Sequence, residues 1–173
     1  MREEPQIKFR QVTEADAEAY LELRRRLDRE TEFMLLQPDE RVTTLEQERS
    51  RLVSLLEQGT SMIFAAESEG RWIGYLGAFG SSYKRNKHTV SLVLGILQSY
   101  SGRGVGTRLF TELNEWAAER GIHRLELTVM AHNEAAIALY KKCGFEVEGI
   151  RKHAIRLGDR YIDEFYMAKL LPL

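Results

Sequence analysis

The stretch that decides the fold runs from residue 94 to residue 107 and reads Leu94-Gly95-Ile96-Leu97-Gln98-Ser99-Tyr100-Ser101-Gly102-Arg103-Gly104-Val105-Gly106-Thr107. Its glycines at 102, 104 and 106 lie between an apolar run that predicts a strand and an amphipathic run that predicts a helix. The start of a helix leaves backbone N–H groups without partners, and residues without a Cβ let a phosphate approach those groups closely. Arg103 adds positive charge, so the loop predicts a pyrophosphate site rather than a plain turn.

Two other phosphate-binding loops do not fit this spacing. The dinucleotide fingerprint is G-x-G-x-x-G followed by an acidic residue at the end of the next strand, where this chain has Val129-Met130. The Gly-Lys-Ser/Thr of a P-loop is absent. The glycine spacing therefore argues against a nucleotide-binding oxidoreductase.

Strand and helix signals alternate on both sides of the glycine loop. We expect a strand over 7–12, a helix from the Thr13/Asp16 capping box to about Glu30, a helix from Thr44/Gln47 to Gly59, a hairpin of 61–67 and 71–79, a strand buried on both faces over 88–97, a helix from Val105 to Gly121, a strand over 124–130 parallel to the previous one, a helix over 133–142, and a last hairpin of 146–156 and 160–170. This order predicts an α/β fold with one mixed sheet of about seven strands, helices on both faces, and a single domain over 1–173.

The composition is that of an ordinary globular protein and excludes several classes of function. The 173 residues are 43% hydrophobic and 29% charged, with a formal net charge of −1 that argues against a nucleic-acid partner. No apolar run is long enough to span a bilayer, and the charged start from Met1 to Pro5 lacks the apolar core of a signal peptide. We therefore expect a cytoplasmic protein with no membrane partner. Cys143 is the one cysteine, which excludes an internal disulfide framework and a cysteine-rich metal site, and we expect no metal.

Two motifs resemble those of the GNAT acetyltransferase superfamily. The family loop reads roughly Arg/Gln-x-x-Gly-x-Gly/Ala, and Ser101 to Gly106 matches it except that Ser101 stands where Arg or Gln is usual. The segment from Asn133 to Phe145 resembles the family pattern N-x-x-A-x-x-L-Y-x-x-x-G-F. A weaker match, Glu148-Gly149 followed by Gly158, Tyr161, Asp163 and Met167, is similar to the branches that acetylate ribosomal proteins and small amines.

The resemblance implies a GNAT-like acyl-CoA N-acyltransferase fold and acetyl-CoA as cosubstrate. In this fold the central strand and its parallel neighbour splay apart, and the pantetheine arm lies between them. The residues expected to bind acetyl-CoA are Leu94, Gly95, Ile96, Ser101, Gly102, Arg103, Gly104, Val105, Gly106, Thr107, Asn133 and Tyr140. A homodimer is a further expectation from the family, because the carboxy-terminal strands offer an edge.

Acetyl transfer from a thioester to an amine needs a neutral amine, a stabilised oxyanion and a proton for the departing thiolate. We assign the proton to Tyr140 as general acid, and a backbone N–H near Ile96 is the candidate for the oxyanion. The general base stays open between two residues. In one branch of the family a glutamate occupies the position that is Thr128 here, and Glu126 lies two residues before it on the same side of the strand. The other candidate is His88 at the start of the central strand.

Several other side chains have a simpler structural interpretation. Cys143 stands at the end of a predicted helix, where the negative pole of the dipole disfavours a thiolate, so we expect it to be structural. Tyr161, Asp163 and Glu164 are expected to be solvated hairpin positions, and the basic cluster from Lys84 to His88 a solvated loop.

The sequence thus predicts an N-acetyltransferase for a primary amine, carried by a small molecule or a peptide. We expect the enzyme to work by direct attack of the amine on acetyl-CoA in a ternary complex. The alternative is a non-catalytic module that binds acetyl-CoA as a sensor or partner domain, which has no need of Tyr140 as a proton donor.

Overall fold

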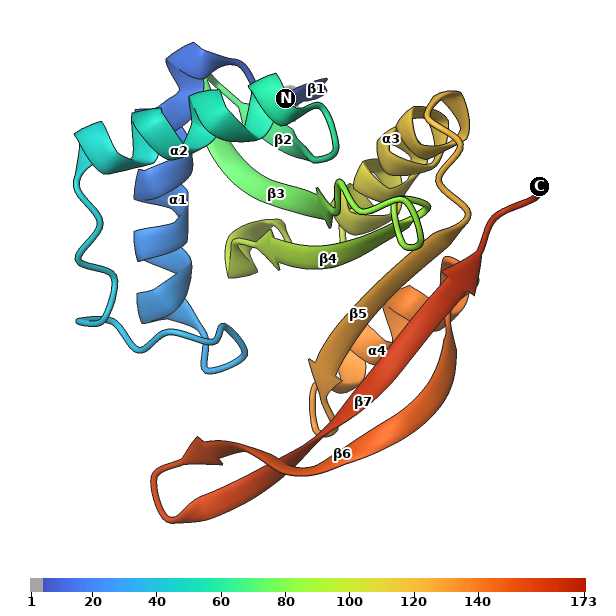
Figure 1. The fold of residues 1–173 in the computed structure, drawn as a ribbon. Coiled ribbons are helices and arrows are strands. Elements are labelled where there is room, and N and C mark those ends of the chain that lie inside the picture. Colours follow the sequence, from blue (N-terminus) through green and yellow to red (C-terminus); the bar gives the residue numbers. More distant parts are fainter. Residues whose placement is uncertain (1–4) are drawn as a thin grey trace.

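The computed structural model describes residues 5–173, which form one seven-stranded sheet with four α-helices packed against it (Figure 1). The charged segment at residues 1–4 lies outside the described residues. The strands follow the order β1-β2-β3-β4-β5-β7-β6, and only the β4–β5 pair is parallel. The elements are β1 (Ile7–Gln11), α1 (Ala17–Glu30), α2 (Leu45–Gln58), β2 (Met62–Ser68), β3 (Arg71–Gly80), β4 (Thr89–Ile96), α3 (Val105–Glu119), β5 (Arg124–Met130), α4 (Glu134–Lys142), β6 (Glu146–Leu157) and β7 (Arg160–Leu170), with 3-10 turns at Glu14–Asp16 and Gln98–Tyr100.

The predicted helix boundaries are confirmed because local capping chemistry sets them. The Thr44 side chain accepts from the backbone N–H of Gln47, the Gln47 side chain accepts from the N–H of Thr44, and Gly59 ends α2 with φ of 67°. Thr13 and Asp16 form the same kind of box before α1, although its first turn is a 3-10 turn. Asn133 caps α4 by accepting from the N–H of Ala136 at 3.3 Å.

Helices cover both faces of the sheet, and two glycines show where they approach most closely. A Cβ on Gly95 of β4 would lie 2.6 Å from Leu27 of α1, so α1 packs on that face. A Cβ on Gly74 of β3, on the opposite face, would lie 3.6 Å from Val105 of α3. Figure 1 shows α1 and α2 together over the first half of the sheet, while the β6–β7 hairpin extends beyond β5.

The expectation that the central strand is buried on both faces is wrong for one face. Val90, Leu92 and Gly95 of β4 are buried, but Ser91 is exposed and Val93 is 41% exposed. Ser91 and Val93 share a face with Gly95, and α1 reaches that face only at the Gly95 end of the strand. One stretch of the sheet is therefore left open beside β4.

No helix within residues 5–173 is long and apolar enough to cross a membrane.

Candidate active site

The centre of the site is a gap between β4 and β5. The two strands pair in parallel only from Thr89 with Arg124 to Ser91 with Glu126, and beyond that point neither strand pairs with the other. The backbone N–H of Leu97 donates to Ile73 of β3 at 2.9 Å. Because antiparallel ladders alternate, the backbone groups of Leu94 and Ile96 point away from β3 and into the gap. They are free to pair with a ligand that lies between the strands.

A cradle of backbone donors lies at the wide end of this gap. Within residues 5–173, the backbone N–H groups of residues 102–107 have no acceptor, and Arg108 is the first to donate back, to Gly104 at 3.1 Å. Gly102 and Gly104 have φ of 72° and 76°, and added Cβ atoms there would meet no atom within 4 Å. The loop is thus an open row of N–H groups at the positive end of α3, which suits a pyrophosphate.

The other two glycines of the motif lie where neighbouring elements pack closely. A Cβ on Gly106 would lie 2.5 Å from Leu139 of α4, so Gly106 allows α3 and α4 to pack closely. The backbone of Gly95 faces β3, and its Cα faces Leu27 and Tyr75 rather than the gap. Ser101 carries no positive charge, but the guanidinium of Arg103 lies 5.3 Å from the ring of Tyr100, at the edge of the cradle.

Tyr140 lies on α4, the helix that follows β5. The side chains of Leu139, the neighbour of Tyr140, and of Ile96 both lie next to Gly106. Helix α4 therefore reaches from the end of β5 to the end of β4. The Tyr140 ring is buried against Phe110 and Phe145, and its hydroxyl donates to no other described residue. Burial raises the pKa of Tyr140 above its ordinary value, with a smaller contribution from Cys143.

The two candidate bases lie at different distances from the gap. Glu126 stands at the last β4–β5 pair, on the open face, where its carboxylate binds Arg124 at 2.8 Å and accepts from Ser91 at 3.4 Å. His88 precedes the other end of β4. At about 3.3 Å per residue it lies about 26 Å along the chain from Ile96. The geometry therefore favours Glu126 over His88.

One carboxylate that was expected to be solvated is buried. Glu164 of β7 is 7% exposed, pairs with Met130 across the sheet, and binds Arg151 at 2.7 Å. Tyr161 is exposed as expected, whereas Asp163 accepts from the backbone N–H of His153 at 2.9 Å. The burial of Glu164 was not predictable from its place near a hairpin turn, because it depends on the partners across β5 and β6.

A polar pocket of about 620 Å³ lies at the end of β5, where Met130 contributes to its lining. One wall is the connection between α1 and α2, residues 31–44, which we call the strap. The opposite wall is the β6–β7 hairpin from Ala154 to Arg160, and Asp28 and Met130 lie between the two walls. None of residues 101–107 lines this pocket, so an acceptor can enter it without displacing a ligand held by the cradle.

Cys143 lies at the end of α4 and is a free cysteine. Cys143 is half-buried, and burial raises the pKa of its thiol, which disfavours the thiolate that a nucleophile requires. Within the described residues, no group of three His, Cys, Asp or Glu side chains is placed to hold a metal ion.

The acetyltransferase (GNAT) family model matches residues 18–145, which contain the glycine loop, the gap and Tyr140. The chain belongs to the GNAT family. Its sequence is 35% identical over 104 residues to the L-amino acid N-acetyltransferase AaaT of Escherichia coli strain K12, a match that covers 59% of this chain and 64% of that relative. The chain thus spans less than two thirds of the length of this curated relative.

Two solved structures share the GNAT fold of this chain over nearly its whole length. The GNAT acetyltransferase of Streptococcus pneumoniae is 30% identical with a TM-score of 0.91, and the match covers 96% of this chain and 100% of that one. The ribosomal-protein-alanine N-acetyltransferase of Brucella melitensis is also 30% identical with a TM-score of 0.82, covering 95% and 99% of the two chains. The predicted family and mixed seven-stranded fold are therefore confirmed.

Proposed function

We propose that residues 1–173 form a single N-acetyltransferase domain that moves an acetyl group from acetyl-CoA to the α-amino group of an acceptor. The observation that carries the proposal is the β4–β5 gap, which has a phosphate cradle at one end, together with the open pocket at the end of β5. In this arrangement the two substrates meet inside the gap in a ternary complex.

The residues present fit acetyl-CoA. The free N–H groups of residues 102–107 hold the pyrophosphate, and the backbone groups of Leu94 and Ile96 pair with the amides of the pantetheine arm. Asn133 already uses its side-chain oxygen to cap α4, so its amide N–H groups are what remain for the pantetheine arm. A serine at position 101 removes one side-chain contact but none of the backbone donors.

The chemistry is a direct displacement. The amine nitrogen bonds to the thioester carbonyl carbon, the carbon–sulfur bond breaks, and the departing thiolate takes its proton from the Tyr140 hydroxyl. Glu126, acting through water, removes the proton from the amine, and the N–H of Ile96 donates to the carbonyl oxygen. Glu126→Gln tests the base assignment through the acid limb of the pH–rate profile, which should shift or disappear.

The acceptor class is proposed from the relatives. AaaT is named for L-amino acids and the Brucella protein for the alanine of a ribosomal protein. Both names refer to an amino acid, free in one case and within a protein in the other. An α-amino group is common to a free amino acid and to a peptide that begins with alanine. The open pocket between strap and hairpin gives room for either.

We also propose that the chain is a catalyst rather than a sensor, that it forms a homodimer, and that it is cytoplasmic. The rival function, a non-catalytic acetyl-CoA sensor, gives no role to a buried tyrosine beside the gap. β6 forms an edge of the sheet, which supports a homodimer, and light scattering in solution tests for one. Fractionation of cells that produce the protein tests the cytoplasmic location.

An amine panel tests the proposed function. The wild-type protein is incubated with acetyl-CoA and either free L-amino acids, an alanine-initiated peptide, or a polyamine, and release of the free thiol is recorded. We expect amine-dependent release with an α-amine from one of the first two groups. Release with the polyamine alone contradicts the acceptor class, and no release with any amine contradicts enzymatic function.

A further inference from the structure

The strap, residues 31–44, is fixed by polar contacts more than by apolar burial. Leu35 is 77% exposed and Val42 is 82% exposed, while Met34 is its one side chain that packs on the core cluster among the described residues. A connection of this length without helix or strand is uncommon in a compact domain and usually has a function. Here it supplies a wall of the acceptor pocket, so what holds it in place matters for binding.

The main anchor joins Arg41 of the strap to Asp28 of α1. Arg41 Nε lies 2.5 Å from Asp28 Oδ2 and its Nη2 lies 3.0 Å from Oδ1, a bidentate pair. The Asp28 side chain is completely buried and the Arg41 side chain is 10% exposed. Asp28 also lines the pocket, so the anchor is part of the pocket itself.

A second buried pair lies directly behind this anchor. Arg24 binds Glu48 of α2 and lies 4.0 Å from the ring of Tyr20. Tyr20, Arg24 and Asp28 are spaced four residues apart and form one stripe on α1. Buried ion pairs rarely stabilise a fold more than apolar residues of the same shape, but they fix the geometry of the groups they join. Charges at these positions therefore point to a positional role.

Two outer contacts hold the ends of the strap. Arg25 donates to the carbonyl oxygen of Thr43 at 2.8 Å. At the other end, His132 Nε2 lies 3.0 Å from Glu32 Oε1, and its ring packs 4.9 Å from that of Phe33. His132 lies two residues beyond the end of β5, so the strap is tied both to α1 and to the segment after β5.

We propose that Arg41 and Asp28 are positioning residues that fix the strap as a wall of the acceptor pocket. They thereby set the affinity for the acceptor but not for acetyl-CoA. This inference rests on the proposed function. The cradle for acetyl-CoA is carried by different elements, α3 and the end of β4, so the two affinities should separate.

The test compares Arg41→Met and Asp28→Asn with wild type, using whichever of two probes the wild type accepts better, L-methionine or an alanine-initiated tetrapeptide. Misplacement of a positioning group by about 1 Å costs up to about 100-fold, so we expect KM for the acceptor to rise about 10-fold or more. The dissociation constant of acetyl-CoA, measured by calorimetry, should stay within about twofold of wild type.

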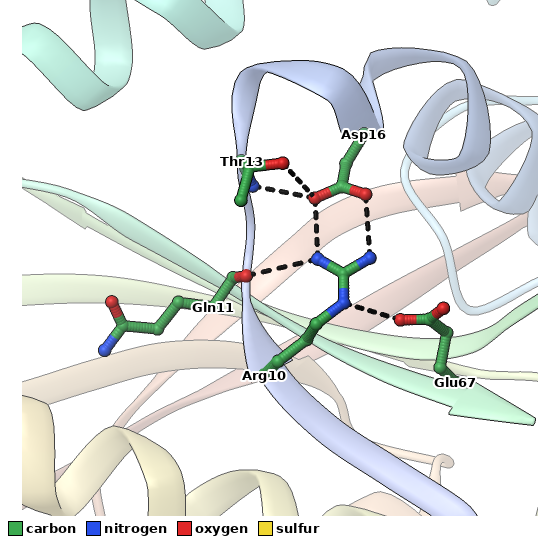
Figure 2. A network of polar contacts seen from close by, with 5 residues as sticks. All are labelled: Arg10, Gln11, Thr13, Asp16 and Glu67. Carbon is green, nitrogen blue, oxygen red and sulfur yellow. Dashed lines mark hydrogen bonds and ion pairs between the residues drawn. The ribbon is translucent and has the colours of Figure 1, made fainter. Parts of the chain in front are cut away.

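Arg10→Met is the matched control because it removes a similar ion network far from the pocket. Figure 2 shows Arg10 of β1 between Asp16 and Glu67. Its guanidinium lies 2.7 and 2.8 Å from the two Asp16 oxygens and 2.6 Å from Glu67. The hydrogen bonds from Arg10 lower the pKa of the Asp16 carboxyl below its ordinary value. This variant should lose thermal stability and keep both the acceptor KM and the acetyl-CoA affinity.

Hydrogen exchange gives a readout that does not depend on activity. Amides of residues 31–44 should exchange faster in Arg41→Met than in wild type, and at the wild-type rate in Arg10→Met. An unchanged acceptor KM in a folded Arg41→Met, an equal rise in Arg10→Met, or unchanged exchange in the strap overturns the inference. If Arg41→Met does not fold, Arg41→Lys and Arg25→Gln are measured against the same criteria. A wild-type protein inactive on every amine refutes the proposed function and the acceptor role together, whereas the exchange data alone decide the anchoring.

Discussion

Tyr140→Phe should lower turnover by about 10²–10⁴-fold, the usual effect of removing a placed general acid, while acetyl-CoA binding changes little. The substitution keeps the ring that packs on Phe110 and Phe145 and removes only the hydroxyl. That hydroxyl donates to no other described residue, so its loss leaves no internal acceptor unpaired. Stability should therefore be nearly unaffected.

The pH dependence follows from the direction of the pKa shift. Burial raises the pKa of Tyr140, so the hydroxyl keeps its proton well above the ordinary tyrosine value of about 10. Donation to a thiolate in water is then further uphill than for an exposed tyrosine. Burial in the gap also raises the pKa of the departing CoA thiol, so the difference between the pKa of Tyr140 and that of the thiol becomes smaller. Wild-type turnover should thus show no alkaline decline below about pH 10 that belongs to Tyr140.

The test of Tyr140 is a comparison of kcat with binding. Single-turnover rates at saturating acetyl-CoA and acceptor separate the chemical step from product release. A purely structural tyrosine gives a slightly less stable protein with near-normal turnover. Wild-type turnover in Tyr140→Phe, with chemistry shown to be rate-limiting, would falsify the assignment.

Gly104→Asp should reduce acetyl-CoA affinity by at least about 100-fold. The open space beside Gly104 lets an aspartate point into the cradle without a clash. Two like charges at 4 Å repel by about 4 kcal/mol at an effective dielectric constant of 20. Because each 1.4 kcal/mol is about tenfold in affinity, half of that repulsion alone lowers the affinity about 25-fold, and the blocked N–H groups add to it.

Gly121→Asp is the control for this substitution. Gly121 has φ of 66° and no atom within 4 Å of an added Cβ, so it imposes the same kind of backbone strain as Gly104 at φ of 76°. It lies at the opposite end of α3, away from the cradle. Calorimetry should show lost binding for Gly104→Asp alone, with similar thermal stability in the two variants. Equal binding by both variants contradicts the cradle. Gly106→Asp is unsuitable, because its side chain would collide with Leu139.

Local patterns predicted most of the fold because they act over a few residues. The capping box at Thr44 and the left-handed glycine at 59 mark the ends of α2 in the sequence itself. The gap between β4 and β5 came from the family resemblance rather than from any pattern of burial. It is present as expected, with pairing that stops at Ser91.

The features that the sequence did not predict all depend on which elements meet in space. The exposure of Val93 follows from how far α1 extends over β4, and the burial of Glu164 follows from its neighbours on β5 and β6. Arg41 and Asp28 look like ordinary surface residues in the sequence, because neither lies in a recognisable motif. The sequence marks Gly106 as part of the glycine motif, but its packing against Leu139 depends on the position of α4.

Mass spectrometry of both the acceptor and the protein after one turnover tests the central claim most directly. Wild-type protein is mixed with acetyl-CoA and the accepted α-amine, quenched, and analysed for where the acetyl group resides. Direct transfer in a ternary complex predicts acetyl on the α-nitrogen of the acceptor, no acetylated Cys143, and no thiol release when the amine is omitted. Acetyl-CoA consumed without an acetylated α-amine, or an acetyl group on Cys143 that passes to the amine, contradicts the account.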